Sequence, residues 1–315
     1  MKQKVIFSSF FIFFLINYVF AQAPQQQMQF DILDENGLFF TDLKMFDLKI
    51  NQLRNATLEI KTGNSLEIMV MIDASASQEK TLPIEKKAAQ TFIDSFLKTE
   101  KDKIAIVSFA DKVLLEQDLT NNFQKAKQQI EKIEFVAPSG FIGGGVIIGR
   151  PPANKNQAIA GSTSIWDSLK QVLNAFSKIN NAESQKAVIL ISDGVNTYGE
   201  SKIKEVAEFS IRTKIPIYAI GVGDDNYDGV DKKSLEKLCE QTGGIAVVPK
   251  KNLEDLTEKL KSLGQSLRSS YKLSFDSVFT ETKGEIQELK VEIANSELRK
   301  RKLRIIQPKG IFVLN

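Results

Sequence analysis

The sequence predicts an α/β fold in which a Rossmann-like, doubly wound and mostly parallel six-stranded sheet with helices on both faces is inserted into a small β-sandwich. Three observations predict it. Short, almost continuous apolar segments such as Leu66–Ile72 are typical of strands that are buried on both faces of a sheet. Helical patterns separate these segments, and strands that alternate with helices favour parallel pairing. Both ends of the chain carry short segments of alternating apolar and polar residues, which are typical of antiparallel strands.

Strands and helices alternate in the central domain, residues 64–268. The strands are expected at 66–72, 103–109, 112–119, 187–191, 216–222 and 245–248, with 112–119 as an antiparallel edge strand. The helices are expected at 82–97, 122–133, 201–212, 231–241 and 253–267, and one more begins just after Thr163. In that last helix Ile165, Leu169 and Val172 recur at the spacing of one buried face, as in a helix that covers a sheet.

The two flanking segments, residues 22–63 and 269–315, have too few strands to bury a core separately. We therefore expect them to pack together as the β-sandwich. Residues 23–29, with a proline and repeated glutamines, are expected to be a short linker. The basic run Arg299–Lys302 is flanked by leucines and is expected to form the solvated face and turn of a hairpin, with partner binding as the alternative.

Residues 1–21 have the pattern of a secretory signal peptide. Two lysines precede an apolar core, and Val19–Ala21 offers a cleavage site. An uncleaved anchor is the alternative, because the core is near the lower length limit for a membrane span. We expect cleavage, no membrane insertion of the mature chain, and a location that is secreted, periplasmic or elsewhere in the cell envelope.

Composition excludes several kinds of chemistry. The 315-residue chain contains no histidine, which excludes imidazole metal ligands, histidine general bases and Ser-His-Asp or Cys-His nucleophile systems. Its formal charge of +3 gives no argument for binding to nucleic acid. The single cysteine, Cys239, has no partner for an intramolecular disulfide and lies among leucines, so we expect a small buried side chain. Nothing in the sequence indicates an oligomeric state.

Oxygen-bearing side chains follow two of the expected buried strands. Asp73 ends the first strand and is followed by Ser75 and Ser77, while Asp193 ends a later strand and Thr163 opens the helix between them. Ligands bind at the carboxyl ends of the strands in an open α/β sheet, and carboxylate and hydroxyl oxygens suit a hard cation. The alternative is that Asp73, Ser75 and Ser77 are turn and helix-capping residues.

In this order and on these elements, the five residues resemble the metal-ion-dependent adhesion site of the von Willebrand factor type A domain family. The family motif is Asp-x-Ser-x-Ser, then a Thr and then an Asp in separate loops, and the resemblance covers roughly residues 64–268. It implies that Asp73, Ser75, Ser77 and Thr163 hold Mg²⁺ directly or through water and that Asp193 acts through water. A carboxylate from a protein partner would complete the octahedron. Mn²⁺ and Ca²⁺ are the alternative ions.

The resemblance implies a non-enzymatic, extracytoplasmic module of the adhesion type, which captures an acidic residue of a partner protein through the metal. An accessory subunit of a membrane or envelope assembly is an alternative function. A metal-dependent hydrolase is a further alternative, because a cation at the edge of a sheet can activate water. Against a hydrolase stand the lack of histidine and of a base candidate near the motif, since Asp73 and Asp193 are both committed to the ion.

Two other segments carry hypotheses. Residues 137–161 are rich in glycine, too long for a plain connection, and lead directly into Thr163, so we expect them to shape partner access to the metal; a disordered insertion is the alternative. Residues 224–229 begin like a calcium-binding EF-hand loop, but Leu235 stands where a bidentate glutamate is needed. We therefore expect an ordinary polar loop there.

Overall fold

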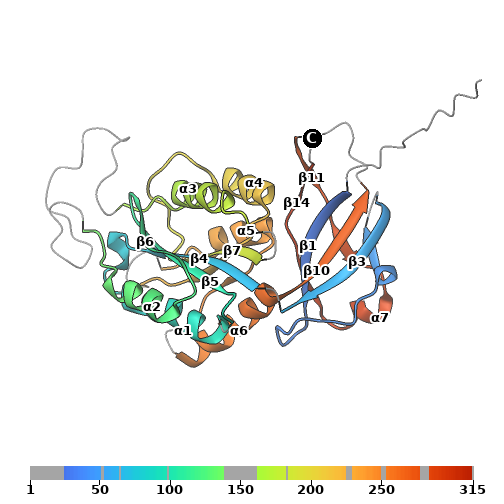
Figure 1. The fold of residues 1–315 in the computed structure, drawn as a ribbon, viewed down its shortest axis with the longest axis horizontal. Coiled ribbons are helices and arrows are strands. Elements are labelled where there is room, and N and C mark those ends of the chain that lie inside the picture. The colour runs from blue at the N-terminus through green and yellow to red at the C-terminus, as the bar shows by residue number, and fades with distance from the viewer. Residues whose placement is uncertain are drawn as a thin grey trace, which may run out of the picture.

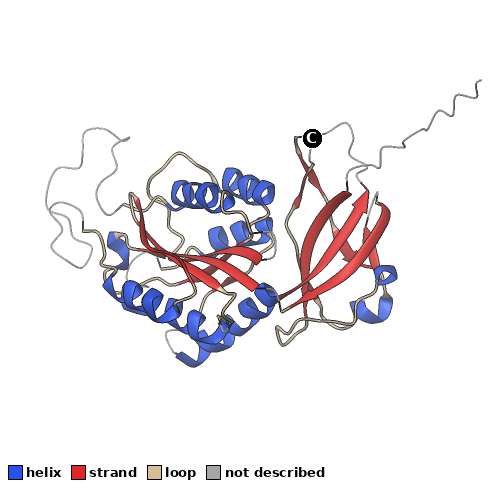
Figure 2. Cartoon of the chain, in the orientation of Figure 1, coloured by secondary structure: helices blue, strands red, loops and turns tan. Residues whose placement is uncertain are grey.

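The computed structural model describes residues 25–50, 53–63, 65–97, 99–137, 162–181, 184–224, 229–249, 253–276 and 284–313. They form a larger α/β domain and a smaller domain made mainly of strands, which lie side by side (Figure 1). The predicted fold class is confirmed. A six-stranded sheet with helices on both faces is inserted between strands that belong to the smaller domain (Figure 2).

The large sheet consists of β4 Ser65–Asp73, β5 Lys103–Phe109, β6 Val113–Thr120, β7 Ser184–Ser192, β8 Ile217–Gly221 and β9 Ala246–Val247. Its strand order is β6-β5-β4-β7-β8-β9. β4 pairs in parallel with β5 and β7, whereas the edge strand β6 runs antiparallel to β5, as predicted. Every residue of β4 after Ser65 is buried, because helices cover both faces of the sheet. The central strand therefore carries Asp73 to the carboxyl edge of the sheet.

The helices of this domain are α1 Leu82–Phe96, α2 Phe123–Lys132, α3 Ile165–Ser177, α4 Ile203–Thr213, α5 Lys232–Thr242 and α6 Leu253–Arg268. α1, α2 and α6 cover one face of the sheet, and α3, α4 and α5 cover the other (Figure 1). Val70 packs with the first group and its neighbour Met71 with the second, as alternate residues of a strand must. Cys239 of α5 is buried in the second core, as predicted, and burial raises the pKa of its thiol.

The smaller domain is built from both ends of the chain. Its elements are β1 Gln25–Leu33, the 3₁₀ turn Met45–Asp47, β2 Leu48–Ile50, β3 Arg54–Thr62, β10 Ser269–Asp276, β11 Ile286–Glu288, β12 Val291–Ile293, α7 Ser296–Arg299, β13 Arg304–Ile306 and β14 Gly310–Phe312. The main sheet has the order β13-β1-β10-β3, and the pairs β11-β14 and β12-β2 complete the domain. The Phe30 and Tyr271 rings stack in its core with their centroids 5.6 Å apart. Strands from the two ends of the sequence thus share one core.

The prediction that residues 23–29 form a linker is wrong for residues 25–29, which are the ones that the structure describes. Gln25–Gln29 belong to β1 and pair with β10 in register up to Phe30 opposite Tyr271. Gln26 and Met28 face the core, while the alternating residues Gln25, Gln27 and Gln29 are exposed. Because almost every residue here is polar, the sequence does not show this alternation of buried and exposed positions. The backbone N–H and C=O groups are nevertheless hydrogen-bonded in the ladder with β10.

The basic run Arg299–Lys302 is exposed, as expected, but it does not form a hairpin turn. Asn295 accepts a hydrogen bond from the Glu297 backbone N–H at 2.9 Å and caps the short helix α7, which takes up the start of the run. The run ends at Lys302, whose φ of 47° is left-handed. The Arg301 guanidinium lies 4.8 Å from the centre of the Phe40 ring. The run is therefore a helix end and a turn that is fixed to the small domain.

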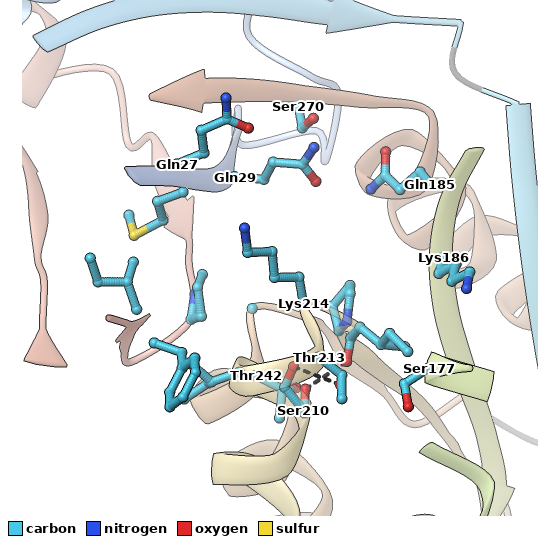
Figure 3. Close-up of a pocket in the computed structure, with 18 of the residues that line it drawn as sticks. Gln27, Gln29, Ser177, Gln185, Lys186, Ser210, Thr213, Lys214, Thr242 and Ser270 are labelled. Carbon is cyan, nitrogen blue, oxygen red and sulfur yellow. Dashed lines mark hydrogen bonds between the residues drawn. The ribbon is translucent and has the colours of Figure 1, made fainter. Parts of the chain in front are cut away.

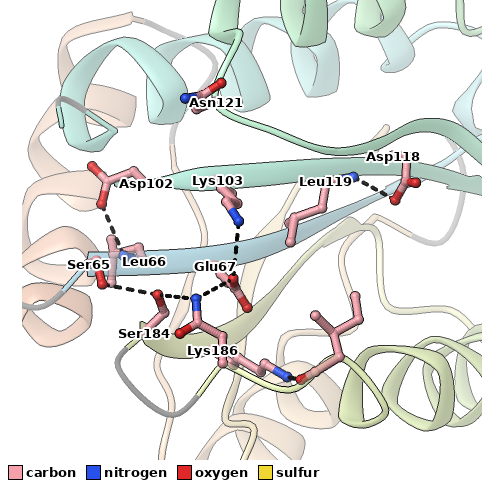
Figure 4. A network of polar contacts seen from close by, with 12 residues as sticks. Ser65, Leu66, Glu67, Asp102, Lys103, Asp118, Leu119, Asn121, Ser184 and Lys186 are labelled. Atoms are coloured by element: carbon pink, nitrogen blue, oxygen red, sulfur yellow. Dashed lines mark hydrogen bonds and ion pairs between the residues drawn. The ribbon is translucent and has the colours of Figure 1, made fainter. Parts of the chain in front are cut away.

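The chain crosses between the domains at two neighbouring points, from β3 into β4 and from α6 into β10. The buried Asp102 carboxylate joins them, because it bonds Leu66 at the start of β4 and Arg268 at the end of α6; Figure 4 shows the bond to Leu66. It accepts hydrogen bonds from the Leu66 N–H at 3.0 Å and from both terminal nitrogens of Arg268 at 2.9 and 2.7 Å. Burial alone would raise the pKa of Asp102, but the hydrogen bonds from Arg268, Thr99 and Leu66 lower it to about 2. The ionised Asp102 carboxylate therefore links the two crossings through hydrogen bonds, and we call Asp102 with Leu66 and Arg268 the Asp102 clip.

Several predictions fall outside the described residues. The expected signal peptide at 1–21, nearly all of the glycine-rich segment 137–161, and residues 225–228 lie there. Within the described ranges, no helix is both long enough and apolar enough to cross a membrane. Asp224, the described start of the EF-hand-like segment, is buried, and its carboxylate lies 3.7 Å from the Lys80 ammonium.

Candidate metal centre

The site begins where the neighbouring strands β4 and β7 end. Asp73 is the last residue of β4 and is 0% exposed. Its Oδ2 accepts a hydrogen bond at 2.7 Å from the hydroxyl of Ser192, the last residue of β7. Its Oδ1 accepts one at 3.0 Å from the Ser75 N–H, which is an Asx turn. The turn role considered for Asp73 is thus present, and it holds the carboxylate at the edge of the sheet.

The loops after β4 and β7 are joined directly by side chains. The Ser75 and Ser77 hydroxyl oxygens lie 3.2 Å apart, and Ser77 donates a hydrogen bond to Asp193 Oδ2 at 3.0 Å. Asp193 Oδ1 accepts from the Val195 N–H at 2.8 Å, which fixes the second loop. Four of the five residues predicted as a metal site therefore form one hydrogen-bonded group with Ser192.

The backbone of Thr163 is tied to the same edge of the sheet. Its N–H donates to the Thr197 hydroxyl at 2.9 Å, and its carbonyl accepts from the N–H groups of Thr197 and Tyr198 at 3.0 Å each, in the loop that follows Asp193. Ser164 donates its N–H to the Ala110 carbonyl just beyond β5. Thr163 is buried, and its hydroxyl makes no hydrogen bond within the described part of the chain. That oxygen is therefore available to a ligand.

The electrostatics of the site are unfavourable without a cation. Burial, followed by the charge of Asp193, raises the pKa of Asp73 to about 7, even though Ser75 and Ser192 donate hydrogen bonds to it. Two carboxylates held together in a buried place repel one another, and a divalent cation would relieve both the repulsion and the loss of hydration.

Gln78 is a residue of this group that the sequence did not reveal. It is fully buried in the 3₁₀ turn Ala76–Gln78 that follows Ser75. Its Nε2 donates to Asp193 Oδ2 at 2.7 Å and to Ser77 Oγ at 3.1 Å, and its Oε1 accepts from the Thr81 hydroxyl. The amide therefore cross-links the two loops a second time.

Glu85 of α1 was missed as well. It is fully buried, and both of its carboxyl oxygens have no hydrogen-bond partner among the described residues. Burial and then the charges of Asp73 and Asp193 raise its pKa well above the usual range. Ala88, Ala89 and Phe92, three, four and seven positions further on, line the same buried face of the helix. That apolar spacing was the signal in the sequence that could have marked Glu85 as buried.

The donor set fits a hard divalent cation. Carboxylate and hydroxyl oxygens are the ligands that Mg²⁺ prefers, and both carboxyl oxygens of Glu85 lie beside Asp73 and Asp193 without a hydrogen-bond partner among the described residues. Within the described ranges, no group of three or more His, Cys, Asp or Glu side chains has the geometry to hold a metal by itself. An ion at this edge would therefore depend on the hydroxyls of Ser75, Ser77 and Thr163.

Two family profiles, both described as von Willebrand factor type A domain, match residues 68–196 and 154–262. The first of these spans all five positions of the candidate site. The chain contains a von Willebrand factor type A domain. In this A domain, the polar group described above occupies the carboxyl edge of the sheet, at the ends of β4 and β7.

Among curated proteins, the chain is similar to inter-alpha-trypsin inhibitor heavy chain H2. It is 30% identical to the Mus musculus protein over 192 residues, and to the Mesocricetus auratus protein over 194 residues. Each match covers 57% of this chain and 17% of the relative, so the chain spans only a small part of these proteins.

Solved structures with a similar fold include an aerotolerance-related membrane protein from Bacteroides fragilis, at 17% identity and a TM-score of 0.47 over 64% of this chain and 98% of that one. Proximal thread matrix protein 1 from the mussel byssus, in a form with a zinc-occupied MIDAS motif, is similar at 20% identity and a TM-score of 0.49. That match covers 69% of this chain and 49% of the mussel chain.

Proposed function

We propose that the chain is a non-enzymatic, extracytoplasmic protein-binding module, which captures an acidic side chain of a partner through a divalent ion. The ion, Mg²⁺ by preference, is held by Asp73, Ser75, Ser77, Thr163 and Asp193. The hydrogen bond of 3.0 Å from Ser77 to Asp193 carries the proposal, because it joins loops 116 residues apart at one point. The extracytoplasmic location depends on the signal-peptide pattern at 1–21.

The roles of the residues follow from their contacts. Ser192 and the Ser75 N–H orient the Asp73 carboxylate, and Gln78 orients Asp193. When bound, the ion supplies an electron-poor centre for an incoming carboxylate. Because much of the ligand set is neutral hydroxyl, the protein leaves more of the positive charge for the partner than an all-carboxylate cage would.

Binding is better supported than hydrolysis. The chain contains no histidine to act as a general base. Asp73 and Asp193 are engaged in hydrogen bonds within the group, and Glu85 is fully buried in α1, away from solvent. Asp73, Asp193 and Glu85, the carboxylates of the group itself, are therefore either hydrogen-bonded or buried, which does not favour the activation of water by any of the three.

Calorimetric titration of Mg²⁺ into the purified chain tests the proposal, with Asp73→Asn as the site variant and Asp94→Asn as its control. Asp73→Asn keeps the size of the side chain and removes the charge, so magnesium binding should be lost while the circular dichroism spectrum is unchanged. Asp94 lies on the surface of α1 beside Lys127, and its change should leave binding intact. Equal binding by Asp73→Asn and the parent chain would contradict the proposal.

The capture step needs a second experiment. A synthetic peptide library with and without glutamate and aspartate can be screened on the immobilised chain in Mg²⁺ and in EDTA. Retention of acidic peptides in Mg²⁺, with release in EDTA and no retention by Asp73→Asn, is the expected result. Retention that is indifferent to EDTA would show that the partner is held by another surface.

A further inference from the structure

A cavity of about 640 Å³ lies between the two domains, at the end of the large sheet opposite to the metal centre (Figure 3). One wall comes from β1 and β10 of the small domain. The other comes from the start of β7, the end of α4 and the residues that lead into β8. Its volume is that of a site for a small organic molecule, and junctions between domains are a common place for such sites.

The wall from the small domain carries hydrogen-bonding groups that the fold does not use. Ser270 is 1% exposed, lines the cavity, and its hydroxyl has no hydrogen-bond partner among the described residues. Gln27 and Gln29 project from the outer face of β1 into the same space, and no described residue hydrogen-bonds to their amides (Figure 3). A buried hydroxyl without a partner is costly, so its presence in a cavity wall points to a ligand.

The opposite wall presents an ammonium group. Lys214 is the residue after α4 and has a left-handed φ of 57°, a position where glycine is usual. Its side chain extends into the cavity toward β1, and it forms no ion pair within the described part of the chain (Figure 3). Lys186 also lines the cavity, but its ammonium donates to the backbone carbonyls of Phe176 and Ile179.

The lining does not balance this positive charge. Among the described residues that line the cavity, Asp31 is the one with a carboxyl group. Asp31 is buried and accepts a hydrogen bond from the Ser266 hydroxyl, and burial raises the pKa of its carboxyl well above the usual range. The described lining therefore holds two lysines, Lys186 and Lys214, against this one carboxyl group.

We propose that this cavity binds a small organic acid rich in hydroxyl groups, with its carboxylate on Lys214 and its hydroxyls on Gln27, Gln29 and Ser270. The amides and the serine offer both donors and acceptors, which matches hydroxyl groups better than an apolar ligand. Ile179 and Phe312 line the cavity too and offer apolar surface to the carbon skeleton. This site is independent of the proposed metal-dependent function, because it lies at the other end of the sheet.

Thermal shift and calorimetry with glucuronate, galacturonate and gluconate test the proposal, with glucose as the neutral control. All measurements are made in EDTA, so that a carboxylate has no metal ion to bind at the other edge. At least one of the three acids at millimolar concentration should raise the melting temperature and bind, while glucose should do neither. No binding by any of the acids, or equal binding by glucose, would overturn the proposal.

Two variants locate the site. Lys214→Gly removes the ammonium and suits the left-handed backbone, and Ser270→Ala removes the unpartnered hydroxyl; each should weaken acid binding about tenfold. Lys302→Gly is a matched control, because Lys302 is another lysine with left-handed φ, 47°, and its side chain is 80% exposed beside Glu35. Lys302→Gly and Asp73→Asn should bind the acid as the parent does. Full affinity in Lys214→Gly and Ser270→Ala would refute the assignment.

Discussion

The side-chain amide of Gln78 donates a hydrogen bond to Asp193 Oδ2 across 2.7 Å, although the two residues are 115 positions apart. Asp193 Oδ2 accepts the Ser77 hydroxyl as well, so one carboxylate oxygen holds two donors from the loop after β4. The neutral side chain of Gln78 therefore helps to hold the two loops of the proposed metal site together without a metal ion. The consequences can be measured in the absence and in the presence of Mg²⁺.

Gln78→Met should lower the free energy of unfolding in EDTA by about 2 kcal/mol, because a buried carboxylate loses a hydrogen bond. Mg²⁺ should restore part of the loss, since a cation at Asp193 replaces the missing donor. Urea unfolding followed by circular dichroism, with and without Mg²⁺, checks this. Gln90→Met is the control: Gln90 bonds the Glu131 carboxylate on the surface of the same domain, and its loss should cost much less. An unchanged midpoint for Gln78→Met would contradict the structural role.

Asp73 should make the metal-free chain less stable as the pH rises. Its pKa is raised to about 7 in the folded protein, so the folded state binds this proton more tightly than the unfolded state. The proton on Asp73 stabilises the fold fully below pH ~4, and this contribution of about 4 kcal/mol is lost as the pH rises to about 7. The difference between parent and Asp73→Asn unfolding energies in EDTA, measured across this range, should show that slope. A difference independent of pH would count against it.

Glu85→Gln should stabilise the metal-free chain at pH 8. The pKa of Glu85 is raised by burial and by two neighbouring carboxylates, so its ionised form is disfavoured in the fold and an amide removes that cost. The gain should shrink toward pH 4, where the acid is protonated in both states. Glu131→Gln on the exposed surface of α2 serves as the control and should change stability little. Destabilisation by Glu85→Gln at pH 8 would show that the carboxylate is needed as an anion.

Asp102→Ala should cost about 3 kcal/mol, because it leaves the Arg268 guanidinium without its buried partner. The pKa of Asp102 is lowered to about 2, so its contribution is present above pH ~4 and is lost as the pH falls toward 2. Parent and variant unfolding energies should therefore converge in acid. Asp94→Ala breaks an ion pair at the surface with Lys127 and should cost less than about 1 kcal/mol. Similar losses of unfolding free energy in Asp102→Ala and Asp94→Ala would indicate that the Asp102 clip contributes little to stability.

The sequence was informative where a pattern is local. The apolar run that ends in Asp73 predicted the central strand, and the spacing of Ile165, Leu169 and Val172 predicted α3. The order of Asp73, Ser75, Ser77 and Asp193 led to residues that hydrogen bonds do bring together. Their binding of a metal stays a prediction.

The rest depends on contacts that no local pattern records. Gln25–Gln29 look like a linker because the strand gains its order from β10, more than 240 residues away. Gln78 has neither charge nor periodicity to mark it, and its role exists only once β4 and β7 are neighbours. The cavity joins side chains as distant as Gln29, Lys214 and Ser270, which face one another only because the domains lie side by side.

The two crossings at Asp102 also determine how the molecule would carry tension. β4 runs for nine residues, roughly 30 Å, from Asp102 to the proposed metal edge, so a partner bound at that edge would pull at the far end of the large domain. The load would reach the small domain through β3 and β10 together, and these strands are paired along their length, from Thr62 opposite Ser269 to Leu58 opposite Leu273 and beyond. Because both strands are pulled from the same end, the load passes on to β1 through its ladder with β10. The hydrogen bonds of that ladder, from Gln25 opposite Asp276 to Phe30 opposite Tyr271, share the load at once instead of opening in turn.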